Sequence, residues 1–183
     1  MNDGREEYAF TWFIENYTYC SYKNGENFWS PDFTTDDLEG TVWCLRLYPR
    51  GHSDEDKGNH SLYLFRRDDV DGPENFPLKY ELSVLAADGA TLHSRQLEYT
   101  FKKRVYYGYH QFLQMNEILL RDKTAYFPED NLKLRCKIWR VEETPIQLQK
   151  LALELALESN KFLFAMWWKV SAHSNVNRRR LSG

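Results

Sequence analysis

Cysteine is scarce in this 183-residue chain, and the few cysteines follow no regular pattern. Cys20, Cys44 and Cys136 are odd in number and far apart, which argues against both a disulfide framework and the short cysteine pairs of zinc sites. The residues from Met1 to Tyr8 are polar and lack the apolar segment of a secretory signal peptide. These absences predict a reduced intracellular protein, located in the nucleus or the cytoplasm.

Long apolar runs and extended basic stripes are also missing. The longest strongly apolar run, Phe162 to Trp168, is far shorter than the roughly 20 residues that cross a bilayer. The net charge is −3 at pH 7, and no extended basic stripe precedes the run Arg178–Arg180. Because phosphate binding needs clustered lysine and arginine, we expect neither a membrane nor a nucleic acid as partner.

The common motifs of catalysis and cofactor binding are absent. No glycine-rich loop follows a predicted strand, and no Gly-x-Ser-x-Gly sequence occurs. The five histidines and three cysteines never fall at the short spacings of zinc ligands, and the cysteines lie in apolar contexts typical of buried, inert thiols. We therefore expect no catalytic residues, no metal and no cofactor, and we do not expect an enzyme.

What the chain does contain is an alternation of apolar and polar side chains, which is typical of half-buried β-strands. Between residues 43 and 48, one tryptophan and two leucines share a face, and Arg46 lies on the other face. Between residues 61 and 64, Tyr63 opposes two leucines in the same way. A core-facing pattern is thus combined with an arginine and a tyrosine that point away from the core, toward a partner.

The segment 8–143 contains several such short strands, separated by loops that are rich in turn-forming residues. The predicted strands are Tyr8–Ile14, Val42–Tyr48, Ser61–Arg66, Leu78–Leu85, Arg95–Phe101 and Leu132–Val141. Many short strands with almost no amphipathic helix predict an all-β domain, an antiparallel β-sandwich.

The character of the chain changes at Thr144, where the sequence predicts a helix. Thr144 suits the N-cap, Pro145 suits the first helical position, and Gln147 completes a capping box. Over 144–170 an amphipathic helix would have only a narrow polar stripe, so its wide apolar surface must pack on the sandwich, a second copy or a partner. The polar and basic residues 171–183 are predicted to be disordered.

Several motifs occur in a fixed order between Tyr8 and Val141. They are Phe10–Tyr17, Trp43–Arg46 with Pro49–Gly51, Ser61–Leu64, Gly108 followed by Phe112, and Phe127–Leu132. In order and spacing these motifs resemble the MATH (meprin and TRAF homology) domain, and they are most similar to the speckle-type POZ group. The resemblance implies an eight-stranded antiparallel β-sandwich of TRAF-like fold that binds peptides. The residues after Val141 show no POZ (BTB) domain.

In that group the MATH domain captures the substrates of a cullin-type ubiquitin ligase. The resemblance implies that a short Ser/Thr-rich segment, led by an apolar and then a polar residue, lies extended in a groove across one sheet. The peptide-binding residues that it implies in this chain are Arg46, Tyr63, Tyr80, Tyr99, Tyr107, Gly108 and Tyr109. Of these, Tyr80 shares strand parity with Leu82 and Val84, so we expect it to be partly buried.

The chain departs from the family in the segment Val105–Gln111, which is expected to be a loop of the groove. The family commonly has Lys-Asp-Trp-Gly-Phe-Lys-Lys, and this chain has Val-Tyr-Tyr-Gly-Tyr-His-Gln. Aromatic character is kept, the lysines on both flanks are lost, and a tyrosine replaces the acidic residue. Since lysines favour an anionic ligand, a more neutral peptide is expected here.

Other interpretations stay open at this point. Arg46 could be a solvated strand residue, and the tyrosines could serve sheet packing, since aromatic residues favour strands. The chain could instead be a TRAF-like scaffold protein that self-associates through the helix 146–168. An enzyme is a third alternative, because MATH domains also occur attached to proteases, but no catalytic constellation in the sequence supports it.

Overall fold

The computed structural model describes residues 7–17, 21–34, 38–115, 123–140 and 157. The chain divides into two compact units, Met1–Val141 and Glu142–Gly183. The described residues of the first unit form a β-sandwich, and Leu157 is the described residue of the second. The predicted C-terminal helix over 144–170 otherwise lies outside the described residues, as do the predicted disordered tail 171–183 and Cys20.

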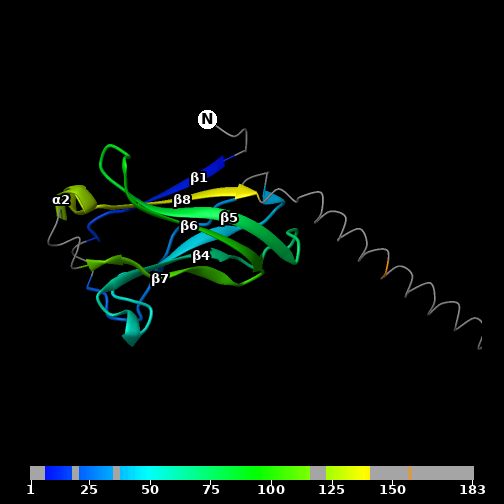
Figure 1. Ribbon diagram of the computed structural model, residues 1–183, viewed down its shortest axis with the longest axis horizontal. Helices are drawn as coiled ribbons and strands as arrows, with labels where there is room; N and C mark the ends of the chain where they lie inside the picture. Colours follow the sequence, from blue (N-terminus) through cyan, green and yellow to red (C-terminus); the bar gives the residue numbers. More distant parts are fainter. Residues whose placement is uncertain (1–6, 18–20, 35–37, 116–122, 141–156, 158–183) are drawn as a thin grey trace, which may run out of the picture. The chain divides into compact units, whose positions relative to one another are not determined.

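Within the described residues, eight strands form two antiparallel sheets of four strands each (Figure 1). The strands are β1 Glu7–Ile14, β2 Phe28–Trp29, β3 Trp43–Tyr48, β4 Asn59–Arg66, β5 Asn75–Leu85, β6 Thr91–Lys102, β7 Tyr106–Gln114 and β8 Leu132–Arg140. One sheet has the order β1-β8-β5-β6, and the other has the order β2-β3-β4-β7. The predicted all-β, eight-stranded antiparallel sandwich is therefore confirmed.

The core lies between the two sheets, and the period-2 alternation of the strands supplies it. Strand β8 buries Leu132, Leu134, Cys136 and Ile138, and the residues between them are only partly covered. The opposite sheet contributes the fully buried Trp43, whose ring packs edge-on against another core aromatic side chain with their centroids 5.0 Å apart. Each fully buried side chain of this size stabilises the fold by about 1.5–3 kcal/mol.

Helical structure among the described residues is limited to short segments in the connections. These are the 3₁₀ helix η3 Asp54–Asp56 between β3 and β4, the single turn α2 Lys123–Tyr126, and η4 Pro128–Asp130 just before β8. Among the described residues, no helix has the length and apolar character needed to cross a membrane. The short helix η3 is the one that bears on the candidate site, because it lies next to strand β7.

The prediction that Val105–Gln111 is a loop is wrong, because Tyr106–Gln114 form strand β7, paired with β4. The sequence hid this strand because β7 lies at a sheet edge, where both Tyr106 and Tyr107 are exposed although they point to opposite faces. An edge strand exposed on both faces has no clear apolar–polar alternation. The two-residue strand β2 was missed for a related reason, since it is too short to show any period.

A buried ion pair fixes the end of β4. The Arg66 guanidinium is fully buried, and its Nε and Nη2 atoms donate to the two carboxylate oxygens of Asp69, each at 2.9 Å. Its Nη1 atom also donates to the Phe101 carbonyl oxygen at 3.2 Å. These bonds tie β4 to the end of β6, in the other sheet, and so help to hold the two sheets in position where β6 and β7 run side by side.

Candidate functional site

A row of residues runs across the outer face of the β2-β3-β4-β7 sheet. In the strand register Trp29 lies opposite Arg46, and Arg46 lies opposite Tyr63. Tyr63 in turn lies opposite Gly108 on the edge strand β7. Residues directly opposite each other in antiparallel strands point to the same face. These four residues therefore form one row, which we call the outer row.

Arg46 is held in the outer row by aromatic rings. Its guanidinium carbon lies 4.6 Å from the ring centroid of Trp29, 4.9 Å from that of Tyr48 and 5.5 Å from that of Tyr106. Its Nε atom donates to the side-chain oxygen of Asn27 at 3.0 Å. Cation–π contacts of this kind contribute about 0.5–1 kcal/mol each at exposed sites. The partly exposed guanidinium is therefore positioned in advance, and it reaches from β3 to the edge strand β7.

Tyr63 lies beneath this surface. It is only 2% exposed, because the rings of Tyr48, His52, Tyr106 and His110 surround it at centroid distances of 5.2–5.8 Å. Its hydroxyl group forms a hydrogen bond with the Nδ1 atom of His110 at 2.7 Å. Burial raises the pKa of Tyr63 well above its usual value, so the hydroxyl stays protonated. Tyr63 thus supports the surface more than it forms it.

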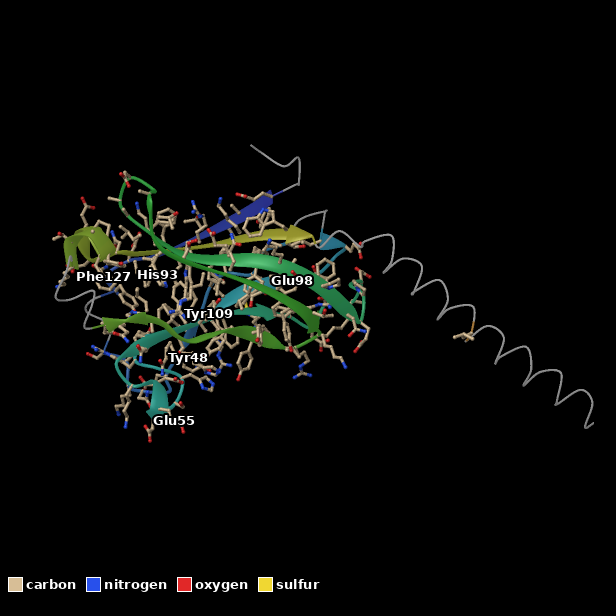
Figure 2. The ribbon with its side chains drawn as sticks, in the orientation of Figure 1. Tyr48, Glu55, His93, Glu98, Tyr109 and Phe127 are labelled. Carbon is tan, nitrogen blue, oxygen red and sulfur yellow. The ribbon has the colours of Figure 1, made fainter. Side chains whose placement is uncertain are left out.

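A second group of tyrosines lies on the other side of β7, facing β6. Tyr107 and Tyr109 stand opposite Leu64 and Leu62, whose side chains face the core. The Tyr107 ring stacks on that of Tyr99 with centroids 4.0 Å apart and an interplanar angle of 8°. The Tyr109 hydroxyl donates to the Gln96 carbonyl oxygen at 2.9 Å. In Figure 2, Tyr109 lies near the space between the sheets, and Tyr48 lies on the far side of the lower sheet.

Tyr80 completes this second group from below. It is fully buried on β5, and its hydroxyl donates to the carbonyl oxygen of Tyr107 at 2.8 Å. Burial raises the pKa of Tyr80 far above its usual value, which keeps this donor protonated. We call Tyr80, Tyr99, Tyr107 and Tyr109 the inner cluster. Its exposed surface comes from Tyr99, Tyr107 and Tyr109, because Tyr80 is covered.

Strand β7 itself separates the outer row from the inner cluster and presents an open edge. Among the described residues, β7 pairs with β4 and with no other strand. Gly108 allows β7 to approach β4 closely, because a Cβ atom there would lie 2.3 Å from the Leu62 carbonyl oxygen and 2.7 Å from the Tyr63 Cα. An unpaired strand edge exposes main-chain donors and acceptors that another extended segment can use.

The structure brings all the residues predicted to bind a peptide to the surroundings of β7, but in two groups. Arg46, Tyr63 and Gly108 belong to the outer row, and the four remaining tyrosines form the inner cluster. Tyr80 was expected to be partly buried and is fully buried. Whether these residues bind a peptide stays a prediction.

Sequence reasoning missed several residues that complete the surface. Trp29, Tyr48 and Tyr106 surround the Arg46 guanidinium, and none of them was predicted. Trp29 lies on the very short strand β2, where no periodic signal exists. Tyr106 lies in the segment interpreted as a loop, and a correct assignment of β7 would have placed it on the face of Phe65, its partner on β4.

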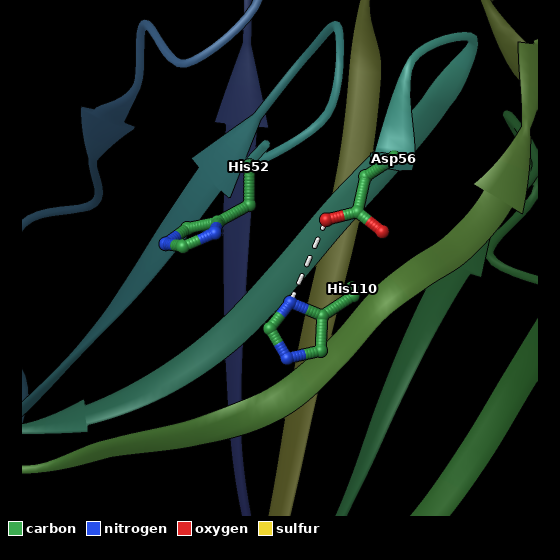
Figure 3. Close-up of side chains that lie close together, drawn as sticks. All are labelled: His52, Asp56 and His110. Atoms are coloured by element: carbon green, nitrogen blue, oxygen red, sulfur yellow. Dashed lines mark ion pairs between the residues drawn. The ribbon is translucent and has the colours of Figure 1, made fainter. Parts of the chain in front are cut away.

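A second omission is a cluster of potential metal ligands, His52, Asp56 and His110 (Figure 3). The His110 Nδ1 atom lies 3.7 Å from an Asp56 carboxylate oxygen, and the two imidazole ring centroids lie 5.5 Å apart. Burial lowers the pKa of His52, and the nearby charges of His110 and Arg46 lower it further. Sequence spacing gave no sign of this cluster, because His52 lies in the loop after β3 and His110 lies far along the chain on strand β7.

The described cysteines behave as expected for structural thiols. Cys44 and Cys136 are free and fully buried, which confirms the prediction of buried thiols at these two positions. Burial raises the pKa of Cys44 to about 12, and it raises that of Cys136 as well. Both side chains therefore stay in the unreactive thiol form at neutral pH.

Comparison with known proteins gives three consistent results. A family model described as the MATH domain matches residues 9–138. The mouse (Mus musculus) protein "TD and POZ domain-containing protein 3" is 27% identical over 154 residues, which cover 81% of this chain and 41% of that protein. The chain thus spans about two fifths of the length of this relative. The solved structure of Notothenia coriiceps TRAF5 has a TM-score of 0.56 at 18% identity, covering 73% of each chain, and shares the fold.

Proposed function

The chain belongs to the MATH domain family, whose members are generally protein-interaction modules, and from this premise we propose that it binds short extended peptide segments along strand β7. The observation that carries the proposal is the open edge of β7, flanked on both sides by exposed aromatic side chains. A peptide that adds to this edge as a further strand gains main-chain hydrogen bonds, and its side chains select it. The role proposed is binding and not catalysis.

The alternating side-chain directions of a bound peptide strand would explain why the candidate residues form two groups. Successive side chains of an added strand point to opposite faces of the sheet. One set would therefore contact the outer side, at Arg46 and Tyr106, and the other set would contact Tyr99, Tyr107 and Tyr109 of the inner cluster. A single extended peptide would use both groups at once.

The chemistry of the two sides supports a largely neutral ligand. The inner cluster offers stacked tyrosine rings, which suit an apolar side chain. The outer side offers the Arg46 guanidinium and the exposed Tyr106, which suit polar side chains and carbonyl groups. A segment led by an apolar and then a polar residue, and rich in serine and threonine, fits this arrangement. Phosphorylation of the segment is not required, because Val105, His110 and Gln111 stand where the family has lysines.

The cellular role that we propose is that of a substrate-recognition adaptor, of the kind that selects proteins for cullin-type ubiquitin ligases in the nucleus or the cytoplasm. The support is the likeness to the mouse relative, whose name includes a POZ domain, together with the family of the chain. In such a role the β7 edge would hold the substrate, and recruitment of the ligase would need a POZ domain.

A peptide-array screen tests this function directly. The array carries Ser/Thr-rich peptides led by an apolar and a polar residue, each also in a phosphorylated copy, and is probed with the wild-type chain and the variant Arg46→Ala. We expect a subset of unphosphorylated peptides to bind the wild-type chain. Since buried arginine and aromatic anchors contribute about 2 kcal/mol or more, Arg46→Ala should weaken binding about 30-fold.

The matched control is Arg135→Ala, which removes an arginine from β8 in the opposite sheet. This variant should bind the same peptides as tightly as the wild-type chain. The proposal fails if no peptide binds above background, or if Arg46→Ala and Tyr107→Ala both bind as tightly as the control.

A further inference from the structure

We propose that His52, Asp56 and His110 form a binding site for a divalent transition-metal ion of the zinc class, exposed beside Tyr63 (Figure 3). One ligand atom from each of the three side chains lies within 4.8 Å of the other two. His52 belongs to the loop after β3, Asp56 to the 3₁₀ helix η3, and His110 to strand β7. The existence of this site does not rest on the function proposed above.

The geometry is close to what a zinc ion needs. Zinc bonds to imidazole nitrogen and carboxylate oxygen are about 2.0–2.2 Å long, so two ligand atoms of one tetrahedral ion lie roughly 3.3–3.5 Å apart. The His110 Nδ1 atom and the Asp56 carboxylate oxygen, at 3.7 Å, are almost at this separation already. The His110 side chain is 62% exposed, so its imidazole has room to turn inward. The His52 imidazole is partly exposed and packs edge-on against the Tyr48 ring, with centroids 4.7 Å apart.

Asp56 is the fixed member of the cluster. Its side chain is only 8% exposed, and the Ser53 hydroxyl donates to its Oδ2 atom at 2.9 Å. A metal ligand that a neighbouring residue already holds by a hydrogen bond does not have to be fixed in position when the ion binds. The Asp56 carboxylate would therefore keep its position when an ion binds, and the imidazoles would adjust to it.

The loop that carries His52 and Asp56 is also ordered in advance. The Asn24 amide donates to the carbonyl oxygens of Arg50 and Ser53 at 2.9 and 2.8 Å. Gly51 has φ +99°, and a Cβ atom there would lie 2.4 Å from the Asp56 carbonyl oxygen, so the loop closes tightly on itself. Such support keeps potential ligands near their binding geometry, which is what distinguishes a site from a chance cluster.

The ligand set selects the class of ion. Two imidazoles and one carboxylate suit zinc, copper, nickel or cobalt, whereas magnesium and calcium prefer oxygen ligands alone. The exposed carboxylate of Glu55, in the same short helix, adds negative charge nearby, and Arg46 opposes it. The Asp54 carboxylate is instead paired with the Lys57 ammonium group at 2.8 Å. Three protein ligands leave a fourth position for water or for a side chain of another molecule.

Tyr63 holds the His110 imidazole in place before an ion binds. Its hydroxyl lies 2.7 Å from the His110 Nδ1 atom, and its ring packs edge-on against that imidazole. An ion that takes Nδ1 displaces the Tyr63 hydroxyl from that atom, so the metal bond replaces this hydrogen bond. The edge-on contact stays in place and continues to orient the imidazole ring.

Calorimetric titration of the full chain with zinc chloride tests the proposal. We expect one zinc ion per chain, and no binding of magnesium chloride at the same concentrations. Each of the variants His52→Ala, Asp56→Asn and His110→Ala should weaken zinc binding at least about 10-fold, since each removes a ligand from a site with only three. The matched controls Asp54→Asn and His93→Ala should bind zinc like the wild-type chain.

Circular dichroism establishes that each variant is folded, and if Asp56→Asn fails to fold, His110→Ala decides, because its side chain is exposed. Titration with cobalt chloride gives an independent readout: visible absorption bands of a nitrogen- and oxygen-ligated ion should appear in the wild-type chain and be lost in His110→Ala. The proposal is overturned if the wild-type chain binds no zinc, or if the variants His52→Ala and His110→Ala bind it as tightly as the controls.

Discussion

Arg46 is the residue at which the chemistry of the proposed peptide site is concentrated. Its planar guanidinium lies over aromatic rings and donates from Nε to Asn27. A lysine at this position would keep the charge but lose both the planar stacking and the Nε donor. The side chain therefore acts through its shape as well as its charge.

We predict that Arg46→Lys weakens binding of the tightest array peptide by about 1 kcal/mol, because the charge remains while the oriented stack is lost. Isothermal titration calorimetry of wild type, Arg46→Lys and Arg46→Ala gives the measurement, with Arg135→Lys as control. Equal affinity of Arg46→Lys and the wild-type chain would show that charge alone matters and would contradict the role of the aromatic rings.

His60 provides a prediction on stability and pH. It lies on β4 at 2% exposure, packed near the Tyr17 ring with centroids 5.6 Å apart. Burial, with a smaller effect of the Arg50 charge, lowers the pKa of His60 from 6.5 to about 3. The folded chain therefore keeps His60 neutral at pH values where the unfolded chain protonates it. The stability that depends on neutral His60 is present above pH 6.5 and is lost progressively as the pH falls toward 3.

Between pH 7 and pH 5, the wild-type chain should lose about 2 kcal/mol more of its free energy of unfolding than the variant His60→Leu, which cannot be protonated there. Urea denaturation of both proteins at the two pH values measures this difference. Parallel losses in the two proteins would mean that His60 is not held neutral by burial.

At the residue scale, the sequence predicted the direction of a side chain better than its exposure to solvent. Strand parity put Arg46 and Tyr63 each on the side away from the core, and the strand register has them opposite each other. Parity could not predict that Tyr63 is covered, because the covering rings of His52 and Tyr106 come from a loop and from a strand far away in the sequence. Burial by residues that are distant in the sequence depends on tertiary structure, so the local sequence gives no sign of it.

At the scale of elements, the proposed peptide site depends on strand β7 and on its close pairing with β4. Gly108 is the point of closest approach, where any Cβ atom would meet the backbone of β4 at Leu62 and Tyr63. Backbone atoms cannot move aside as a flexible side chain can, so the strand itself would have to shift.

We predict that Gly108→Ala destabilises the domain by about 1–3 kcal/mol and also removes peptide binding, because it displaces β7 from β4. Gly89→Ala in the turn between β5 and β6 is the control: Gly89 has φ +85° and open space around it, so only its backbone conformation is strained. That control should lose about 1 kcal/mol of stability and keep its peptide affinity. Urea denaturation and fluorescence anisotropy with a labelled array peptide measure both effects, and a Gly108→Ala variant with wild-type affinity would contradict the role of β7.

The sequence predicted strands best where one face is buried and the other is not. The strand over Leu132–Val141 was predicted from a clean alternation and is found at Leu132–Arg140. Strands β5 and β6 start three and four residues earlier than predicted, at Asn75 and Thr91. The early residues of each strand pair with the last residues of the other, so pairing holds them and not burial alone. Strand β7, the element that matters most for function, was the one whose exposed edge position removed the signal.

At the scale of the whole molecule, the sandwich is a rigid frame that holds one strand edge open between two groups of aromatic side chains. The buried pair of Arg66 and Asp69 and the aromatic core fix this frame. The family and fold were predictable from motif order, since those motifs lie in core strands and their turns. The division of the site into an outer row and an inner cluster was not, because it follows from which strands are neighbours in space.

The predicted helix over 146–168 gives a prediction on assembly. Its wide apolar surface needs a covering partner, and a second copy of the chain is one candidate, as in the scaffold alternative. If the helix drives self-association, the full chain should sediment as an oligomer and a shortened chain ending at Val141 as a monomer. Two monomers at the same protein concentration would exclude self-association through this segment.

The most direct test of the central claim, that a peptide adds to β7 as a strand, is a backbone N-methyl scan of the tightest array peptide. N-methylation removes one main-chain donor at a time and leaves every side chain in place. In an added strand only alternate residues donate to β7, so fluorescence anisotropy should show affinity losses at every second residue across the bound segment. Losses without this period, or no loss at any position, would contradict strand addition to β7.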